Sequence, residues 1–197
     1  LEQSFIEQYH VYLKSDLGLK PTTVSGYLKC LKYVVKIAFN NGWMPRNPFS
    51  LYQYTAPNPE RSFLTEDELR RMMTTELRYK RQDYNRDMFL FSCFTGLRLS
   101  DVRSLTWGKI VKAPDGKTLY IRITMQKTQK LVNVPLSKEA DDCLNPKENP
   151  EEPIFTLPTG TSNIERNIEK WMQNAQIDKH ITYHSSRHTF ATLLVMD

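Results

Sequence analysis

The sequence predicts a mainly α-helical protein with one small three-stranded antiparallel sheet, divided into a short helical N-terminal domain and a larger second domain. Three observations support this fold class. Apolar residues recur at helical spacing over most of the 197 residues, residues 109–135 alternate with a period of two, and residues 45–59 carry four prolines without sustained periodicity. A hydrophobic content of 40% allows one good core and a smaller second one.

Two helices are predicted before the proline-rich segment. The first spans residues 1–15, with apolar positions at Leu1, Phe5, Tyr9 and Leu13. The second begins at Pro21 and ends at Gly42, because proline suits the first helical turn and glycine suits the position after a helix end. We place the first domain at residues 1–56, a linker at 57–62 and the second domain at 63–197.

The second domain is predicted to begin with helices. Thr65 and Glu68 form a capping box for a helix that runs through Met73. A strongly apolar helix over residues 87–94 stops at Gly96, and a short helix follows Ser100.

A three-stranded antiparallel meander is predicted next, from the segments KIVKA, TLYIRIT and LVNVP and the turns PDGK and QKTQK between them. This stretch is strongly basic. Its cations are Lys109, Lys112, Lys117, Arg122, Lys127 and Lys130, against the single acid Asp115. The sheet therefore carries a net charge of +5, which equals that of the whole chain and indicates a polyanionic partner.

Helices return after the sheet. They are predicted at residues 137–144, at residues 163–175 with a capping box of Ser162 and Glu165, and in the final segment HSSRHTFATLLV. The three cysteines, Cys30, Cys93 and Cys143, lie far apart within apolar helical patterns. This favours reduced core thiols over disulfides or a zinc site.

Several function classes lack their sequence signals. No apolar run approaches the roughly 18 residues that span a membrane. The motifs GxxxxGK[ST], HExxH and GxSxG and paired-cysteine metal signatures are absent, so we predict no metal site and no cofactor. What remains is a set of basic residues placed at the ends of predicted elements.

Four of these residues suit phosphodiester chemistry. Arg98 follows a helix stop and Arg187 begins a helix, and two guanidinium groups can hold the non-bridging oxygens of a phosphate as charge develops on them. Lys127, at a hairpin tip, can give a proton to a leaving oxygen, and His184 can take one from a nucleophile.

Each feature also has a simpler explanation. Arg98 and Asp101 could form an ordinary ion pair at a helix start, and Lys127 and Lys130 could be solvated hairpin lysines. A lysine face on the second helix, formed by Lys29, Lys32 and Lys36, fits a solvated surface and a phosphate-tracking surface equally well. The four-residue spacing of His180, His184 and His188 would also suit a metal on one helix face.

Three segments, TGLRLSDVRSLTW, QKTQKLVNVPLS and HSSRHTFATLLV, resemble successive motifs of the tyrosine recombinases, the phage-type integrases of bacterial mobile elements. Residues 63–197 resemble the family's catalytic domain and residues 1–56 its helical core DNA-binding domain. The resemblance implies a site-specific recombinase that cleaves and rejoins duplex DNA through a 3′-phosphotyrosine, without a metal or other cofactor.

The resemblance also implies roles for individual positions. Arg98, Lys127, His184 and Arg187 match catalytic residues, with Asp101 and His188 in support, and Lys29, Lys32, Lys36 and Lys130 are expected to contact DNA. The family's nucleophilic tyrosine lies beyond the second arginine, whereas all ten tyrosines here precede His184. Tyr183, just before a helix start, is expected to be a packing residue. We therefore expect this chain to be truncated before the nucleophile, to bind DNA and to be inactive alone.

By analogy with the family, the resemblance also implies a tetramer on paired DNA sites, an accessory DNA-bending protein as partner, no membrane association and a bacterial cytoplasmic location. Two rival functions stay open. One is a DNA-binding regulator that keeps the fold without catalysis, which the missing tyrosine permits. The other is a type IB topoisomerase-like enzyme, which shares the arginine, lysine and histidine chemistry; the compact helical first domain favours the recombinase.

Overall fold

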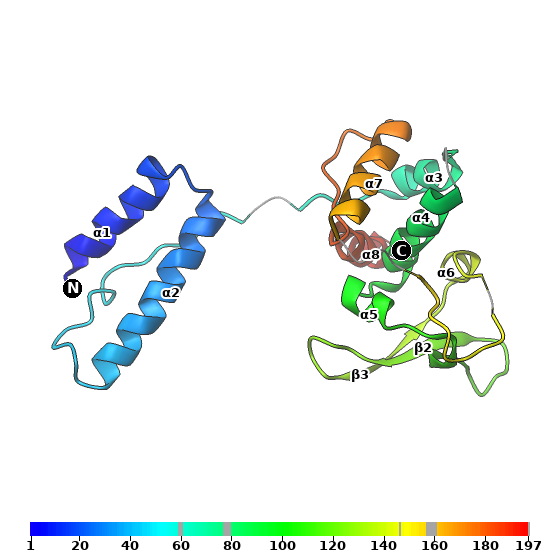
Figure 1. The fold of residues 1–197 in the computed structure, drawn as a ribbon, viewed down its shortest axis with the longest axis horizontal. Coiled ribbons are helices and arrows are strands. Elements are labelled where there is room, and N and C mark those ends of the chain that lie inside the picture. The colour runs from blue at the N-terminus through cyan, green and yellow to red at the C-terminus, as the bar shows by residue number, and fades with distance from the viewer. Residues whose placement is uncertain (59–60, 77–79, 146, 157–160, 197) are drawn as a thin grey trace. The chain divides into compact units, whose positions relative to one another are not determined.

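The computed structural model describes residues 1–58, 61–76, 80–145, 147–156 and 161–196. The chain divides into two compact units, Leu1–Glu60 and Arg61–Asp197, which are drawn in Figure 1. Each unit has a hydrophobic core of its own.

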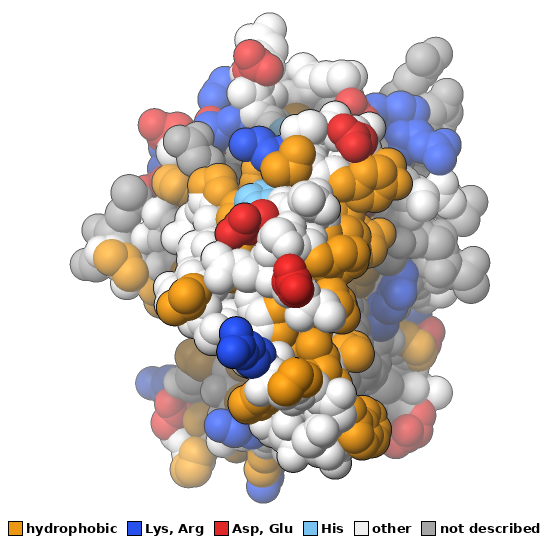
Figure 2. Space-filling view, turned by 90° about the vertical axis from the view of Figure 1, so that its left-hand side faces the viewer, with side chains coloured by type: hydrophobic (Ala, Val, Ile, Leu, Met, Phe, Trp, Pro, Cys, Tyr) orange, Lys and Arg blue, Asp and Glu red, His pale blue; other side chains and the backbone are white. Residues whose placement is uncertain are grey.

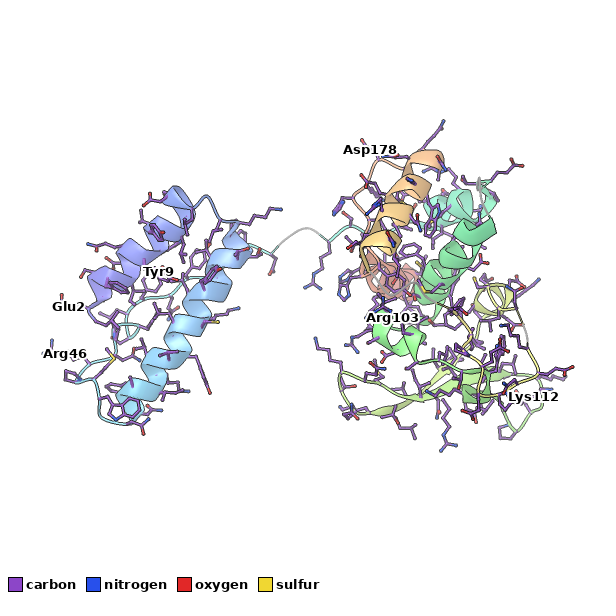
Figure 3. The ribbon with its side chains drawn as sticks, viewed as in Figure 1. Glu2, Tyr9, Arg46, Arg103, Lys112 and Asp178 are labelled. Atoms are coloured by element: carbon purple, nitrogen blue, oxygen red, sulfur yellow. The ribbon has the colours of Figure 1, made fainter. Side chains whose placement is uncertain are left out.

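The first unit consists of two helices and the segment that returns along them. Helix α1 (Gln3–Val11) continues into a π-helical turn, η1 (Tyr12–Asp16), and α2 (Pro21–Asn40) begins at the predicted proline. The buried core residues of this unit are Ile6, Leu13, Val24, Leu28, Val35 and Phe49. Tyr9 points from α1 toward α2 (Figure 3) and packs against this core. The predicted stripe was partly wrong, because Leu1 and Phe5 are exposed and Ile6 is buried in their place.

Large hydrophobic side chains also remain on the surface of this unit. Figure 2 shows hydrophobic side chains gathered over the face of the first unit. The most exposed are Tyr33, Trp43 and Leu51. Cys30 is exposed as well, so its prediction as a core thiol was wrong: it lies on the outward side of α2. Cys93 and Cys143 are buried, as predicted.

The second unit opens with three helices. Helix α3 (Glu66–Thr74) has the predicted capping box, in which the Thr65 side chain accepts from the Glu68 backbone N–H and the Glu68 carboxylate accepts from that of Thr65. Helix α4 (Lys80–Thr95) begins seven residues before the predicted start and ends, as predicted, before Gly96. Helix α5 (Leu99–Arg103) follows.

The predicted meander is confirmed. After a 3-10 turn, η2 (Trp107–Lys109), the strands β1 (Ile110–Lys112), β2 (Leu119–Thr124) and β3 (Leu131–Pro135) pair antiparallel in the order β1-β2-β3. On the central strand Ile121 and Ile123 are buried while Arg122 and Thr124 face outward, which is the period of two expected for a half-buried sheet.

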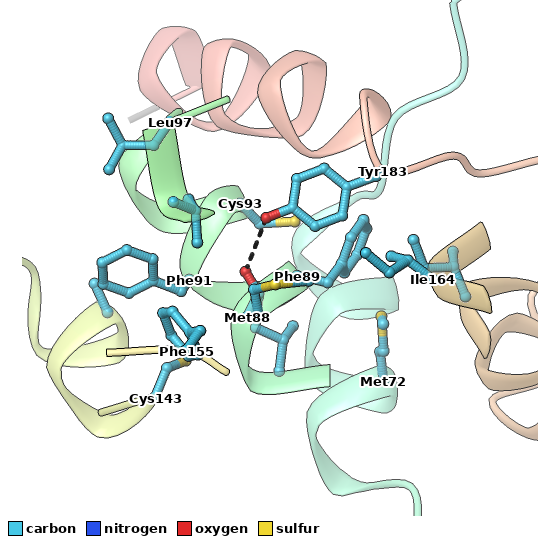
Figure 4. Packing of buried hydrophobic residues seen from close by; sticks show 14 of the residues in the cluster. Met72, Met88, Phe89, Phe91, Cys93, Leu97, Cys143, Phe155, Ile164 and Tyr183 are labelled. Carbon is cyan, nitrogen blue, oxygen red and sulfur yellow. Dashed lines mark hydrogen bonds between the residues drawn. The ribbon is translucent and has the colours of Figure 1, made fainter. Parts of the chain in front are cut away.

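Three helices complete the unit: α6 (Lys138–Asp142), α7 (Thr161–Asn174) and α8 (Ser185–Met196). Helix α4 packs against all three. Figure 4 shows the resulting core, in which Phe89 and Phe91 of α4 lie among side chains from the surrounding helices. No helix in the described ranges is both long and apolar enough to cross a membrane.

One predicted capping box is wrong. Ser162 lies inside α7 and is exposed, so it is not the residue that precedes the helix. The carboxylate of Glu165 instead accepts hydrogen bonds from the backbone N–H of Tyr183, outside its own helix.

Candidate functional site

Arg98 is placed by the turn that links α4 to α5. Gly96 has a φ of +65°, a left-handed conformation that glycine adopts without steric cost, and this turns the chain sharply after α4. Arg98 is half-buried and directly precedes α5. Its Nη1 atom is buried and has no hydrogen-bond partner in the described structure, so this donor is left unsatisfied by the protein.

Arg187 reaches the same turn from the first part of α8. Its Nη1 donates to the carbonyl oxygen of Gly96. Burial lowers the pKa of Arg187, the nearby positive charge of Arg98 lowers it further, and the Asp101 carboxylate opposes both effects. Two guanidinium groups are therefore held close enough to repel each other, an arrangement that an anion between them would stabilise.

Asp101 connects this turn to the sheet. The side chain is 1% exposed, and its Oδ1 accepts from the backbone N–H of Gln126 at 2.9 Å. Its Oδ2 is buried without a hydrogen-bond partner within the described ranges. The two residues Arg98 and Asp101 form no ion pair within 4.0 Å, which removes the simple helix-start ion pair as an explanation. Asp101 instead fixes the start of the turn that carries Lys127.

His184 and His188 lie at the start of α8. His184 is exposed and immediately precedes the helix, while His188 is half-buried. Their ring centroids are 5.3 Å apart, with the rings nearly perpendicular. Burial lowers the pKa of His188, and the charges of Arg61, His184 and Arg187 lower it further. Several basic groups therefore act on one another electrostatically at this helix start.

A hollow of about 160 Å³ joins several of these groups. Its lining residues are Leu97, Arg98, Leu99, Glu165, Tyr183, His184, Ser186 and Arg187. The structure therefore brings together Arg98, His184 and Arg187, three of the four residues predicted to be catalytic. Glu165, which the sequence analysis had assigned to a capping box, lies in the same hollow.

Lys127 does not line this hollow. It is exposed in the turn between β2 and β3, and the hydrogen bond from the neighbouring Gln126 N–H to Asp101 connects this turn to the site. Lys130 is also exposed, at the end of the same turn. The turn is closed by hydrogen bonds from Met125 N to Lys130 O and from Gln129 N to Met125 O.

The predicted lysine face lies on α2 of the first unit. Lys29, Lys32 and Lys36 are all exposed. Lys29 and Lys32 border a hollow of about 130 Å³, together with Ser25, Leu28, Phe49, Tyr52 and Tyr54. Basic side chains beside aromatic ones are a combination found in nucleic-acid interfaces.

Tyr183 is buried, as expected of a packing residue. Its ring lies in the core among residues of α4 (Figure 4), and its hydroxyl hydrogen-bonds Ser92 and the carbonyl oxygen of Met88. Burial raises the pKa of this phenol well above its usual value. Both properties oppose a role as nucleophile, which needs an accessible and deprotonated oxygen.

The predicted metal alternative finds no geometric support. His180 lines a different hollow from the one that His184 lines. Among the residues that the structure describes, no group of three histidine, cysteine or acidic side chains lies close enough to hold a metal ion.

Comparison with known proteins gives the chain its family. Residues 62–197 match the phage integrase family and residues 1–56 match the phage integrase SAM-like domain. A tyrosine recombinase of Thermosipho africanus is 27% identical over 213 residues, covering 99% of this chain and 71% of that protein.

Solved structures show the same fold. The Tn1549 transposon integrase, in complex with circular intermediate DNA, has a TM-score of 0.72 at 17% identity and covers 100% of this chain and 73% of that one. The lambda integrase tetramer bound to a Holliday junction has a TM-score of 0.68 at 17% identity, with coverages of 98% and 59%. From the matched family models, this chain belongs to the phage integrase family of tyrosine recombinases.

Proposed function

We propose that this chain is the DNA-binding and phosphate-activating part of a site-specific recombinase. The observation that carries the proposal is the convergence of Arg98, His184 and Arg187 on one hollow, with a buried Arg98 donor left without a partner. Two guanidinium groups with a histidine beside them suit a phosphodiester whose oxygens gain charge in the transition state.

In the proposed reaction, Arg98 and Arg187 hold the non-bridging oxygens of the scissile phosphate. A tyrosine oxygen loses its proton to His184 and attacks phosphorus. This attack forms a 3′-phosphotyrosine as the bond from phosphorus to the 5′ oxygen breaks. Lys127 gives its proton to that departing oxygen. The reverse steps rejoin the strands. In this scheme Asp101 positions the Lys127 turn, and His188 supports the phosphate site.

The nucleophile in this proposal lies beyond residue 197. Tyr183 lines the hollow, but its buried and hydrogen-bonded hydroxyl cannot serve. The 197-residue chain is therefore expected to bind duplex DNA without forming a covalent adduct. We propose further that the first unit contacts DNA through Lys29, Lys32 and Lys36 and that Lys130 contributes from the hairpin. Family analogy supports assembly as a tetramer on paired sites, with an accessory DNA-bending protein as partner.

The decisive test is covalent trapping on a nicked suicide substrate by the full-length protein that carries the family's tyrosine. Arg187→Ala is expected to reduce adduct formation by at least about 100-fold, because it removes a donor to the developing charge. DNA affinity should change by less than roughly tenfold, since one phosphate contact among several is lost.

Arg70→Ala provides the matched control. Arg70 is an exposed arginine on α3, paired with the exposed Glu66 at 2.8 Å, so its loss should leave trapping unchanged. If the unsubstituted protein binds its DNA site tightly yet never forms an adduct, the enzyme proposal fails and the regulator is favoured. If Arg187→Ala loses DNA binding and trapping in parallel, the catalytic assignment of Arg187 fails.

A further inference from the structure

We propose that Glu165 is a positioning residue for His184. Its carboxylate accepts hydrogen bonds from the backbone N–H of Tyr183 and thereby fixes the position of the neighbouring imidazole in the hollow that Arg98, His184 and Arg187 line. The inference rests on the proposed function. The two carboxylate oxygens of Glu165 lie 3.2 and 3.1 Å from the Tyr183 nitrogen, and Glu165 lines the same hollow as His184.

His184 needs such an anchor because its own side chain has none. The imidazole is exposed, and the described structure gives it an edge-on ring contact with His188 but no side-chain hydrogen bond. Its location therefore depends on the main chain that carries it. That main chain is the two-residue step from Tyr183 into α8, where Ser186 N donates to Tyr183 O at 3.1 Å.

Tyr183 is held at both ends, by two different helices. Its backbone N–H is bound by Glu165 of α7, while its hydroxyl hydrogen-bonds Ser92 of α4 and the carbonyl oxygen of Met88 at 3.4 Å (Figure 4). The residue is 4% exposed, so the ring cannot shift without disturbing the core. Removal of the Glu165 contact would leave the ring fixed and the hydrogen bonds from Ser186 N and Oγ to Tyr183 O in place. It would free the Tyr183 N–H and so loosen one side of the main chain that carries His184.

The negative charge of Glu165 is unfavourable for phosphate binding in this hollow, which indicates that the carboxylate has another role there. Glu165 puts a negative charge into a hollow that also contains Arg98 and Arg187, where it opposes an incoming phosphate. Solvation of α7 does not by itself require an acid at this position, because an uncharged polar side chain would serve without that cost. A carboxylate does, however, accept strongly from a backbone N–H, and here that bond holds the residues that lead into α8.

The test compares Glu165→Gln with Glu165→Ala and Glu165→Asp. The amide oxygen of glutamine can still accept from Tyr183 N–H, whereas alanine lacks an acceptor and aspartate is one methylene too short to reach. The matched control is Glu169→Ala, which removes an exposed acid one turn further along α7.

The first measurement uses the 197-residue chain alone. Amide hydrogen exchange of Tyr183 should speed up in the alanine and aspartate variants and stay slow in the glutamine and Glu169→Ala variants. The His184 imidazole NMR signals should broaden in the first two variants and stay unchanged in the other two. Tyr183 exchange that is the same in all four variants would overturn the proposed anchor, whether or not the protein proves to be a recombinase.

The second measurement uses the full-length protein at saturating suicide substrate. Alanine and aspartate at position 165 should slow adduct formation by about tenfold to a hundredfold, since small misplacements of a reacting group cost that much. Glutamine should restore the rate, and no variant should bind DNA more weakly, since loss of the Glu165 side chain removes no contact to the phosphate and its charge opposes phosphate binding.

Two outcomes would overturn the positioning role itself. One is an alanine variant that traps DNA as fast as the unsubstituted protein. The other is a glutamine variant as slow as alanine although its Tyr183 amide stays protected, which would make the negative charge the important property. An unsubstituted protein that forms no adduct at all refutes the proposed function instead, and the exchange measurement then still decides the anchor.

Discussion

Among the glycines that the structure describes in the second unit, Gly96 has the least room for an added methyl group. A Cβ added there would lie 2.4 Å from Cδ1, 2.7 Å from Cε1 and 3.0 Å from Cγ of Phe190. Carbon atoms in ordinary contact sit about 3.5–4.0 Å apart, so the ring or α8 has to move by about 1 Å. The residue also has a φ of +65°, where a side chain is strained.

The magnitude follows from these two contributions. The left-handed backbone costs alanine about 1–2 kcal/mol relative to glycine. Overpacking against Phe190 adds about 1–3 kcal/mol, so Gly96→Ala should lower the free energy of unfolding by about 2–5 kcal/mol. Gly116 separates the two contributions, because its φ is +68° and an added Cβ there meets nothing within 4 Å. Gly116→Ala should therefore cost only about 1–2 kcal/mol.

The assay is urea unfolding followed by tryptophan fluorescence, in a Trp43→Phe background because Trp43 is exposed on the first unit whereas Trp171 is buried in the second. Phe190→Leu combined with Gly96→Ala should recover part of the loss, since the smaller side chain relieves the contact. If Gly96→Ala and Gly116→Ala destabilise equally within about 0.5 kcal/mol, the close approach of α4 and α8 at Phe190 is wrong.

Two further predictions concern the segment that leads into the second unit. Thr189→Val removes the acceptor for the buried Leu64 N–H, now 3.0 Å from Thr189 Oγ1, and should cost about 1–3 kcal/mol in urea unfolding; a loss below about 0.5 kcal/mol would show that the hydrogen bond is not formed. Burial raises the pKa of Glu68, but hydrogen bonds from Lys179 and Thr65 outweigh it, so that the net pKa is lowered. Such a carboxyl stabilises the fold above its unfolded pKa of about 4.3 and loses that contribution as the pH falls through the lowered value. Glu68→Gln should therefore destabilise the protein at pH 7 and progressively less as the pH falls through the lowered pKa, and an effect that does not diminish with falling pH would contradict the assignment.

The sequence predicts best those features whose signals are local. The capping box of Thr65 and Glu68 needs only residues three apart, and the meander needs only alternation and two turns, so both are found as predicted. The early part of α4 was missed because its sequence, KRQDYNR, has no apolar stripe from which a helix could be predicted. The stripe on α1 was misplaced because a helix with apolar residues on several sides does not reveal which side is covered.

In the candidate site too, the sequence predicted some features and missed those that depend on tertiary contacts. Motif resemblance identified Arg98, His184 and Arg187, and the structure brings them to one hollow. Glu165 was assigned to its own helix, since the sequence pattern S-x-x-E fits a capping box and gives no sign of a partner 18 residues away. Gly96 was correctly identified as a helix stop, but its carbonyl contact with Arg187 has no signal in the sequence.

The sequence by itself therefore determined the helices and strands with local start and stop signals, the cationic sheet, and the residue types of the phosphate site. Only the tertiary structure decided which of them meet: Arg187 with Gly96, Thr189 with Leu64, and Glu165 with Tyr183. The physical reason is range. Caps, turns and periodicity act over a few residues, whereas these contacts depend on which faces of α4, α7 and α8 pack together around one core.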